Sequence, residues 1–218
     1  MLAKSGKAFH RVVAFVDWNS QLLINGVESN ADTLFAARTT FSRTTKRIAS
    51  CLSKLEPNGN FQVRLRLYHG WHKGYEPTAN KKAAVQVLVE TDFSALSDKP
   101  NVTFSADVEF GDRLLSALPH RIHEKLAIHL PNTLRERGRN KTHEEKMVDT
   151  ALATDMMVSA YEDPSDWILV AAEDDDLVPP IFAAEAIIKK QGSRVLLLRH
   201  RRQSKNFLKL DEILLNDK

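Results

Sequence analysis

The stretch WILVAAEDDDLVPP, residues 167–180, decides the fold. Its first six residues are apolar and predict a strand buried on both faces. Four carboxylates follow at 173–176, and Pro179 and Pro180 are typical of the first turn of a helix. A buried strand that passes through an acidic turn into a helix is the repeating unit of a parallel sheet covered by helices.

The rest of the chain repeats this alternation. Gly192 is expected to end the helix that starts at the two prolines, and the residues after 205, NFLKLDEILL, are expected to form a last helix or a segment docked on the body. The segment from 110 to 140 gives no clear pattern. Further strands are expected at 11–16, 61–68, 101–108, 125–130 and 194–198, and helices at 33–55, 79–90 and 142–161.

These elements predict one domain over residues 1–218, a three-layer α/β sandwich with a mainly parallel sheet and an insertion around 110–140. The chain is 43% hydrophobic and 27% charged, which is typical of a globular protein and unlike a disordered one. No apolar run could span a bilayer, and residues 1–15 lack the features of a signal peptide. Cys51, the single cysteine, has helical spacing and is expected in the core. We therefore expect a cytoplasmic protein with no membrane association.

Carboxylates stand where the first strand and the 167–172 strand end. Asp17 follows the first strand, and Asp174 and Asp176 follow the second. In a parallel sheet the carboxyl ends of strands share one edge, and ligands bind where the strand order reverses. If the two strands are neighbours there, these acids converge. Asp149, early in the 142–161 helix, could point to the same edge.

The start of that helix is predicted from a capping box, with Thr142 as the cap and Glu145 three residues later. Asp155 follows Asp149 by six residues, a rotation of about 240° around the helix, so it could reach the site only from the flank.

Carboxylates gathered in one cleft repel one another unless they are protonated or bound to cations. Oxygen ligands without accompanying histidines or cysteines favour Mg²⁺ or Mn²⁺, which activate water in phosphodiester hydrolysis. Asn19 could orient a water or a carboxylate. The alternative is that these acids cap helices or lie exposed on loops.

Positive charge is concentrated in two segments, residues 135–146 and 199–205, although the net charge is only +3. Both segments could flank the acidic cleft and bind phosphates of a nucleic acid. A solubilising surface is the other interpretation. The candidate phosphate-binding residues are Arg135, Arg137, Arg139, Lys141, Arg199, Arg201 and Arg202.

Three motifs together resemble the NYN domain of the PIN-like ribonuclease superfamily: FVDWN at 15–19, EEKMVDTALATDMM at 144–157 and WILVAAEDDDLVPPI at 167–181. The resemblance covers most of the chain in order but is only general from 70 to 140. The residues that match the family pattern are Asp17, Asn19, Lys146, Val148, Asp149, Asp155, Asp174, Asp176 and Pro179.

The resemblance implies a metal-dependent endoribonuclease with one or two Mg²⁺ or Mn²⁺ ions. Asp17, Asp149 and Asp174 would then be the main ligands, with Asp176 and Asp155 in support, and Asn19 would join the catalytic set. Its substrate would be RNA, single-stranded or structured. A homo-oligomer or a regulatory protein partner is left open.

The chain departs from the family pattern at the acidic turn. Ala172 and Glu173 replace a Ser-Gly pair, so that Glu173 could be an extra ligand or could crowd the site. Leu177 replaces an aromatic residue, and Asp175 is expected to face solvent. This departure motivates a second hypothesis, a catalytically degenerate module that binds RNA or a protein.

Three other interpretations have less support. A phosphatase with an aspartyl nucleophile requires a second Asp at position 19, where Asn19 stands. Trp71 could stack on a base or be a structural aromatic. His69 and His72 lack the further ligands that a zinc site requires.

Overall fold

The computed structural model describes residues 8–26, 32–122, 128–137, 142–200 and 214–215. Within these residues, seven strands form a central sheet in which neighbouring strands pair in parallel. The order is β11-β10-β9-β1-β2-β5, and β6 also pairs with β2. The strands are β1 (Phe9–Asp17), β2 (Asn60–Tyr68), β5 (Val102–Phe104), β6 (Glu109–Phe110), β9 (Trp167–Ala171), β10 (Val195–Leu198) and β11 (Leu214–Leu215).

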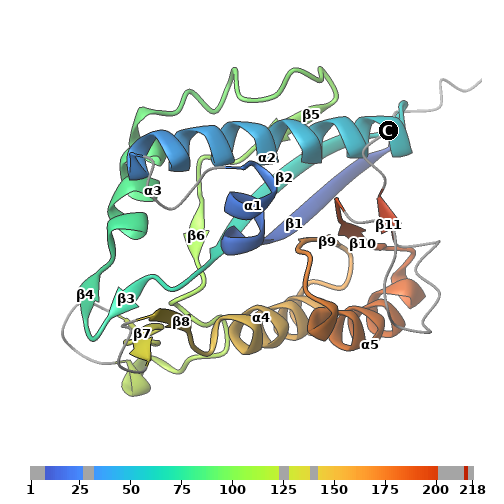
Figure 1. The fold of residues 1–218 in the computed structure, drawn as a ribbon. Helices are drawn as coiled ribbons and strands as arrows, with labels where there is room; N and C mark the ends of the chain where they lie inside the picture. The colour runs from blue at the N-terminus through green and yellow to red at the C-terminus, as the bar shows by residue number, and fades with distance from the viewer. Residues whose placement is uncertain (1–7, 27–31, 123–127, 138–141, 201–213, 216–218) are drawn as a thin grey trace, which may run out of the picture.

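Helices cover both faces of this sheet (Figure 1). The helices α1 (Trp18–Ile24), α2 (Thr33–Leu55) and α3 (Ala79–Glu90) pack on one face, and α4 (Val148–Glu162) and α5 (Val178–Ile188) pack on the other. Alternate residues of β1 enter the two cores, because successive side chains of a strand point to opposite faces. Val12, Ala14 and Val16 contribute to the first core, and Val13 and Phe15 to the second. The predicted α/β class with a mainly parallel sheet is confirmed.

The strand order reverses at β1. From β1 the chain proceeds through α2 to β2 and then through α3 to β5, on one side of β1. It later returns to place β9 on the other side, with Val16 paired to Ala171. The carboxyl ends of β1 and β9 therefore lie together at a switch point, which meets the condition under which the sequence predicted that their acids converge.

Two helices match their predicted ranges. Both α2 and α3 have the predicted bounds, and Cys51 is buried in the core. No helix in the described ranges has the length and apolar character needed to cross a membrane.

The predicted capping box at Thr142–Glu145 is wrong. These residues form strand β8, which pairs antiparallel with β7 (Leu134–Arg137) in a separate hairpin. The helix α4 begins at Val148, after Met147 adopts a left-handed backbone with φ of 65°. The backbone of residues 142–145 hydrogen-bonds to β7, so these residues cannot form the first turn of a helix as the local pattern predicted.

Other boundaries also differ. The strand expected at 101–108 is reduced to β5, with a bend before the short β6. Of the strand expected at 125–130, residues 125–127 lie outside the described part; Ile128 is buried. Of the C-terminal segment, only β11 is described, and it docks on β10 as a strand. The remaining described elements are the β3 (His72–Lys73) and β4 (Glu76–Pro77) hairpin and the 3₁₀ turns η1 (Pro119–Arg121), η2 (Asp175–Leu177) and η3 (Lys189–Gln191).

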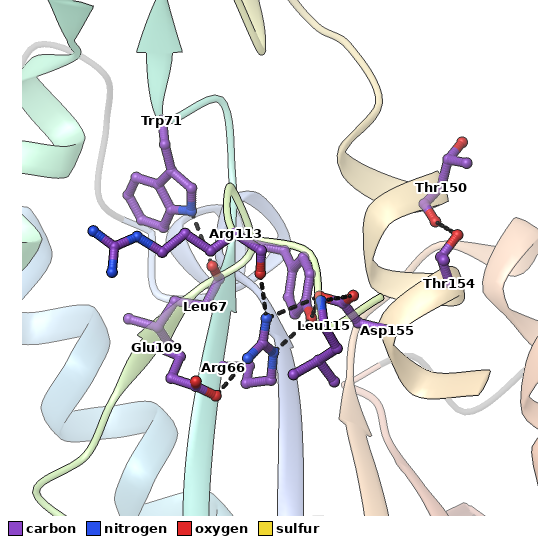
Figure 2. A network of polar contacts seen from close by, with 10 residues as sticks. Arg66, Leu67, Trp71, Glu109, Arg113, Leu115, Thr150, Thr154 and Asp155 are labelled. Atoms are coloured by element: carbon purple, nitrogen blue, oxygen red, sulfur yellow. Dashed lines mark hydrogen bonds and ion pairs between the residues drawn. The ribbon is translucent and has the colours of Figure 1, made fainter. Parts of the chain in front are cut away.

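A buried ion pair fixes α4 against the sheet (Figure 2). Asp155 of α4 is fully buried and accepts hydrogen bonds from Arg66 Nη2 at 2.9 Å, the Tyr68 hydroxyl at 2.8 Å and the Leu115 backbone N–H at 2.8 Å. Arg66 also donates to the Arg113 carbonyl at 2.8 Å and pairs with Glu109. Burial raises the pKa of Tyr68, so its hydroxyl keeps the proton that it donates. The network joins α4 to β2, β6 and residues 113–115.

Replacing Asp155 with Asn should lower the free energy of unfolding. The change removes the charge that faces the buried Arg66 and puts an amide among donors, and breaking a buried pair in this way costs about 3 kcal/mol or more. Chemical denaturation of D155N beside the wild type measures the loss. Asp163→Asn, at the exposed end of the same helix, is the matched control. A D155N stability within about 0.5 kcal/mol of the wild type would contradict this account of the network.

Candidate functional site

The carboxyl ends of β1 and β9 border an acidic cavity of about 420 Å³. Four segments supply its lining: the β1–α1 junction, the end of β8, the first turn of α4 and the turn after β9. The lining residues are Asp17, Asn19, Ser20, Glu145, Asp149, Glu173, Asp174 and Asp175. The structure therefore brings together the four residues predicted as catalytic: Asp17, Asn19, Asp149 and Asp174.

Asp17 is held at the floor of this cavity. It is the last residue of β1 and the N-cap of α1, where its carboxylate accepts from the Ser20 backbone N–H at 3.2 Å and from the Ser20 hydroxyl. Only 6% of the residue is exposed. Burial raises the pKa of Asp17 and the negative charge of Glu145 adds to this, although the bonds from Ser20 oppose it. Asn19, in α1, is exposed at the rim.

Asp149 carries the clearest sign of crowded negative charge. It lies in the first turn of α4. Its pKa is raised to about 6, first by partial burial and then by the charges of Asp17, Asp174, Glu145 and Asp176, in that order of size. A cation in the cavity would relieve this repulsion.

The turn after β9 is ordered by its own carboxylates. Asp174 is the N-cap of η2 and accepts from the Asp176 backbone N–H at 2.8 Å. Asp176 is exposed and is not part of the cavity lining, although its charge acts on Asp149. As a predicted metal ligand, Asp176 therefore lies at the edge of the site.

Arg199 was predicted to bind phosphates of a nucleic acid. In the structure its guanidinium instead binds residues of this turn and is not free. It is 4% exposed, donates to the Glu173 carbonyl at 2.8 Å and pairs with Asp175 at 2.7 Å. Asp175, expected to face solvent, is partly exposed and lines the cavity beside Arg199. Burial of Arg199 at the end of β10 explains why its guanidinium is not free.

Glu173, the departure from the family pattern, is anchored within the turn. Its carboxylate accepts from the His200 backbone N–H at 2.5 Å, and its own N–H donates to the Ser20 hydroxyl at 3.3 Å. The side chain lines the cavity from this anchored position.

Glu145 is a site residue that sequence reasoning missed. It was assigned to a helix cap, whereas the structure places it at the end of β8 with its carboxylate in the cavity. Its Oε1 pairs with His69 Nδ1 at 2.5 Å and accepts from the Gly70 N–H. The sequence offered one indication of this role, the Glu144–Glu145 pair before the Lys-x-Val-Asp motif. The partners of Glu145, His69 and Gly70, lie far away in the sequence.

Asp155 is not brought to this cavity. Its carboxylate faces β2 and is bound by the three donors described above, so its predicted role in support of a metal site is not fulfilled by this geometry (Figure 2). The cause is the rotation between positions 149 and 155 of one helix, which turns the second side chain into the core.

The remaining basic candidates are only partly described. Arg135 is exposed on β7, in the hairpin whose other strand ends at Glu145. Arg137 ends β7, and Arg139, Lys141, Arg201 and Arg202 lie outside the described residues.

The aromatic and histidine candidates are structural. Trp71 is buried, and its indole N–H donates to the Leu67 carbonyl at 2.9 Å, so its faces are not open to a base. His69 faces Glu145, and His72 faces a different carboxylate, Asp112, at 3.3 Å.

The donor chemistry of the cavity fits a hard divalent cation, because its side chains offer carboxylate oxygens and their mutual repulsion acts on Asp149. In the part of the chain that the structure describes, however, no three His, Cys, Asp or Glu side chains already lie close enough to hold one ion. Binding therefore requires side-chain rotations that close the carboxylates onto the cation.

Replacing Asp149 with Asn should stabilise the metal-free protein at neutral pH. Because the folded pKa is about 6 and the ordinary value is 3.8, the proton on Asp149 stabilises the fold below about pH 4, and this contribution is lost as the pH rises through 6. A shift is worth about 1.4 kcal/mol per pKa unit, and solvent screening at this exposed side chain reduces the gain to about 1 kcal/mol.

Denaturation of D149N and the wild type in a chelator, at pH 7.5 and at pH 4, checks this sign. The variant should be the more stable protein at pH 7.5, and the difference should shrink at pH 4. A variant that is less stable at pH 7.5 would contradict the charge crowding.

Comparison of the chain with models of protein families, with curated proteins and with solved structures found no match. The likeness to the NYN domain therefore rests on the three sequence motifs alone.

Proposed function

We propose that the protein is an Mg²⁺- or Mn²⁺-dependent endoribonuclease of the NYN type, with its active site in the acidic cavity. The observation that carries the proposal is the meeting of Asp17, Asp149 and Asp174 at the switch point of a parallel sheet, where burial and the neighbouring carboxylates raise the pKa of Asp149 to about 6. Parallel strands flanked by helices on both faces are also what a PIN-like fold requires.

Asp17, Asp149 and Asp174 would hold the cation, with Asp176 at the edge. When bound, the cation activates water and stabilises charge on the phosphodiester. The chain's own residues prepare the site: Ser20 fixes the Asp17 carboxylate, the η2 turn fixes Asp174, and Asn19 at the rim is available to orient a water or a phosphate oxygen.

Arg135 supports a substrate with a phosphate backbone, such as RNA. It is an exposed cation on the β7–β8 hairpin, and that hairpin leads directly to the cavity through Glu145. A cation placed beside an acidic metal site can bind the phosphates that flank the cleaved bond.

A catalytically degenerate RNA-binding or protein-binding module is the second candidate. Two observations favour it: no three carboxylates lie in ligating positions in the described residues, and Glu173 adds negative charge at the turn. This candidate predicts RNA binding that does not depend on divalent ions.

The direct test is cleavage of single-stranded and hairpin RNA by the purified protein in Mn²⁺ or Mg²⁺. We expect cleavage that a chelator abolishes and that falls by about 100-fold or more in Asp17→Asn and Asp149→Asn, because each variant loses a carboxylate that would hold the cation. Asp163→Asn, at the opposite end of α4, should cleave like the wild type.

Equal cleavage by the wild type and D17N would indicate a contaminating nuclease and contradict the proposal. Absence of cleavage in either metal, with RNA binding that persists in chelator, would favour the degenerate module.

Replacing Arg135 with Gln should weaken RNA binding without a change of sequence preference. A phosphate contact releases counterions, so its loss should lower the slope of log affinity against log salt by about 1. Fluorescence anisotropy with labelled RNA at several salt concentrations measures the slope. Lys99→Gln, at the other edge of the sheet beside β5, is the control; an equal effect of both changes would contradict a role for Arg135 in particular.

A further inference from the structure

We infer that Glu145 is an additional cation-binding carboxylate of the cavity. It takes the supporting role that the family pattern gives to Asp155. The inference rests on the proposed function, since it concerns the ligands of the same site. It assigns a role to a residue that lies on the β7–β8 hairpin, before α4 begins.

Asp155 is already saturated by protein donors. Its two oxygens accept from Arg66, Tyr68 and Leu115, at 2.9, 2.8 and 2.8 Å, and it has no exposed surface. Figure 2 shows the carboxylate directed at Arg66 and the 113–115 segment. To bind a cation, Asp155 would have to leave the buried Arg66 without one of its two carboxylate partners, which is costly.

Glu145 has the opposite setting. Its carboxylate lines the acidic cavity together with Asp17 and Asp149, and its position is fixed from behind. His69 Nδ1 lies 2.5 Å from Oε1, and the Gly70 N–H donates to the same oxygen. His69 is itself buried and contacts the Asn80 side chain through Nε2 at 2.7 Å. A carboxylate ligand oriented by a histidine and a backbone N–H is the usual outer support of a metal site.

Gly70 makes this approach possible. A Cβ at this position would lie 2.9 Å from Leu134 Cδ1 and 3.3 Å from Glu145 Oε1. The absence of a side chain therefore lets the β7–β8 hairpin pack against the end of β2 and carry Glu145 to the cavity.

Electrostatics agree with this placement. The charge of Glu145 is among the causes that raise the pKa of both Asp17 and Asp149. His69 and Gly70 lower the pKa of Glu145 itself against the effect of its burial, so the carboxylate is kept ionised. An ionised carboxylate close to two others is placed to share a cation with them.

The test is calorimetric titration of Mn²⁺ into the wild type, Glu145→Gln and Glu144→Gln. Glu144 is the matched control, because it is the neighbouring residue of β8 and its side chain points to the other side of the strand, toward Lys146 at 3.6 Å. We expect E145Q to bind Mn²⁺ at least about 10-fold more weakly than the wild type, and E144Q to bind within about 3-fold of it.

Asp149→Asn separates the inference from the proposed function. If D149N loses Mn²⁺ binding while E145Q binds like the wild type, the inference is overturned and the metal site of the proposed function stands. If the wild type itself binds no Mn²⁺, both are overturned.

A measurement on the wild type covers the case in which E145Q does not fold. The Gly70 amide reports on Glu145 because it donates to its carboxylate. In an NMR titration with Mg²⁺, the Gly70 amide signal should shift and saturate at the same Mg²⁺ concentration as that of Asp149. A Gly70 signal that stays in place while the Asp149 signal saturates would overturn the inference.

Discussion

The parallel pairing of β1 with β9 sets the position of the acidic cavity. Val16 lies opposite Ala171, so the chain leaves both strands at the same level and in the same direction. Asp17 and the turn that holds Asp174 must then be neighbours. The helix α4 packs beside this edge because Asp155, Arg66 and Tyr68 form a buried network, and its first turn adds Asp149.

Concentrating negative charge at one edge has a cost, and the surrounding residues reduce it. Ser20 donates to Asp17, Gly70 donates to Glu145, and His200 donates to Glu173. Glu145 also pairs with His69, and Asp175 pairs with Arg199. Asp149 still has its pKa raised to about 6. A site with this residual repulsion is less stable empty than it would be without the charge, which is a common property of functional sites.

Local sequence patterns predicted the elements whose bounds depend on nearby residues. The ranges of α2 and α3 and the β9 strand follow from periodicity and from the flanking turn residues, and the meeting of Asp17, Asp149 and Asp174 follows from the parallel topology. Long-range pairing was beyond local patterns. Thr142–Glu145 has the composition of a helix cap but pairs with β7, and the partners of Glu145 lie about 75 residues earlier in the chain.

The two misjudged charges have the same cause. Asp155 and Arg199 were interpreted by residue type, and the core around each decides its role instead. Asp155 finds Arg66 on a strand 89 residues earlier, and Arg199 turns inward to the acidic turn at the end of β10. Burial of a charge with its partner cannot be recognised from one sequence.

The central claim is that the carboxylates at the β1–β9 switch point close around a divalent cation. A crystal structure of the protein soaked in Mn²⁺, with an anomalous difference map, tests it most directly. The account predicts a peak in the cavity within ligating distance of Asp17 and Asp149. A map without a peak in the cavity at saturating Mn²⁺ would contradict it.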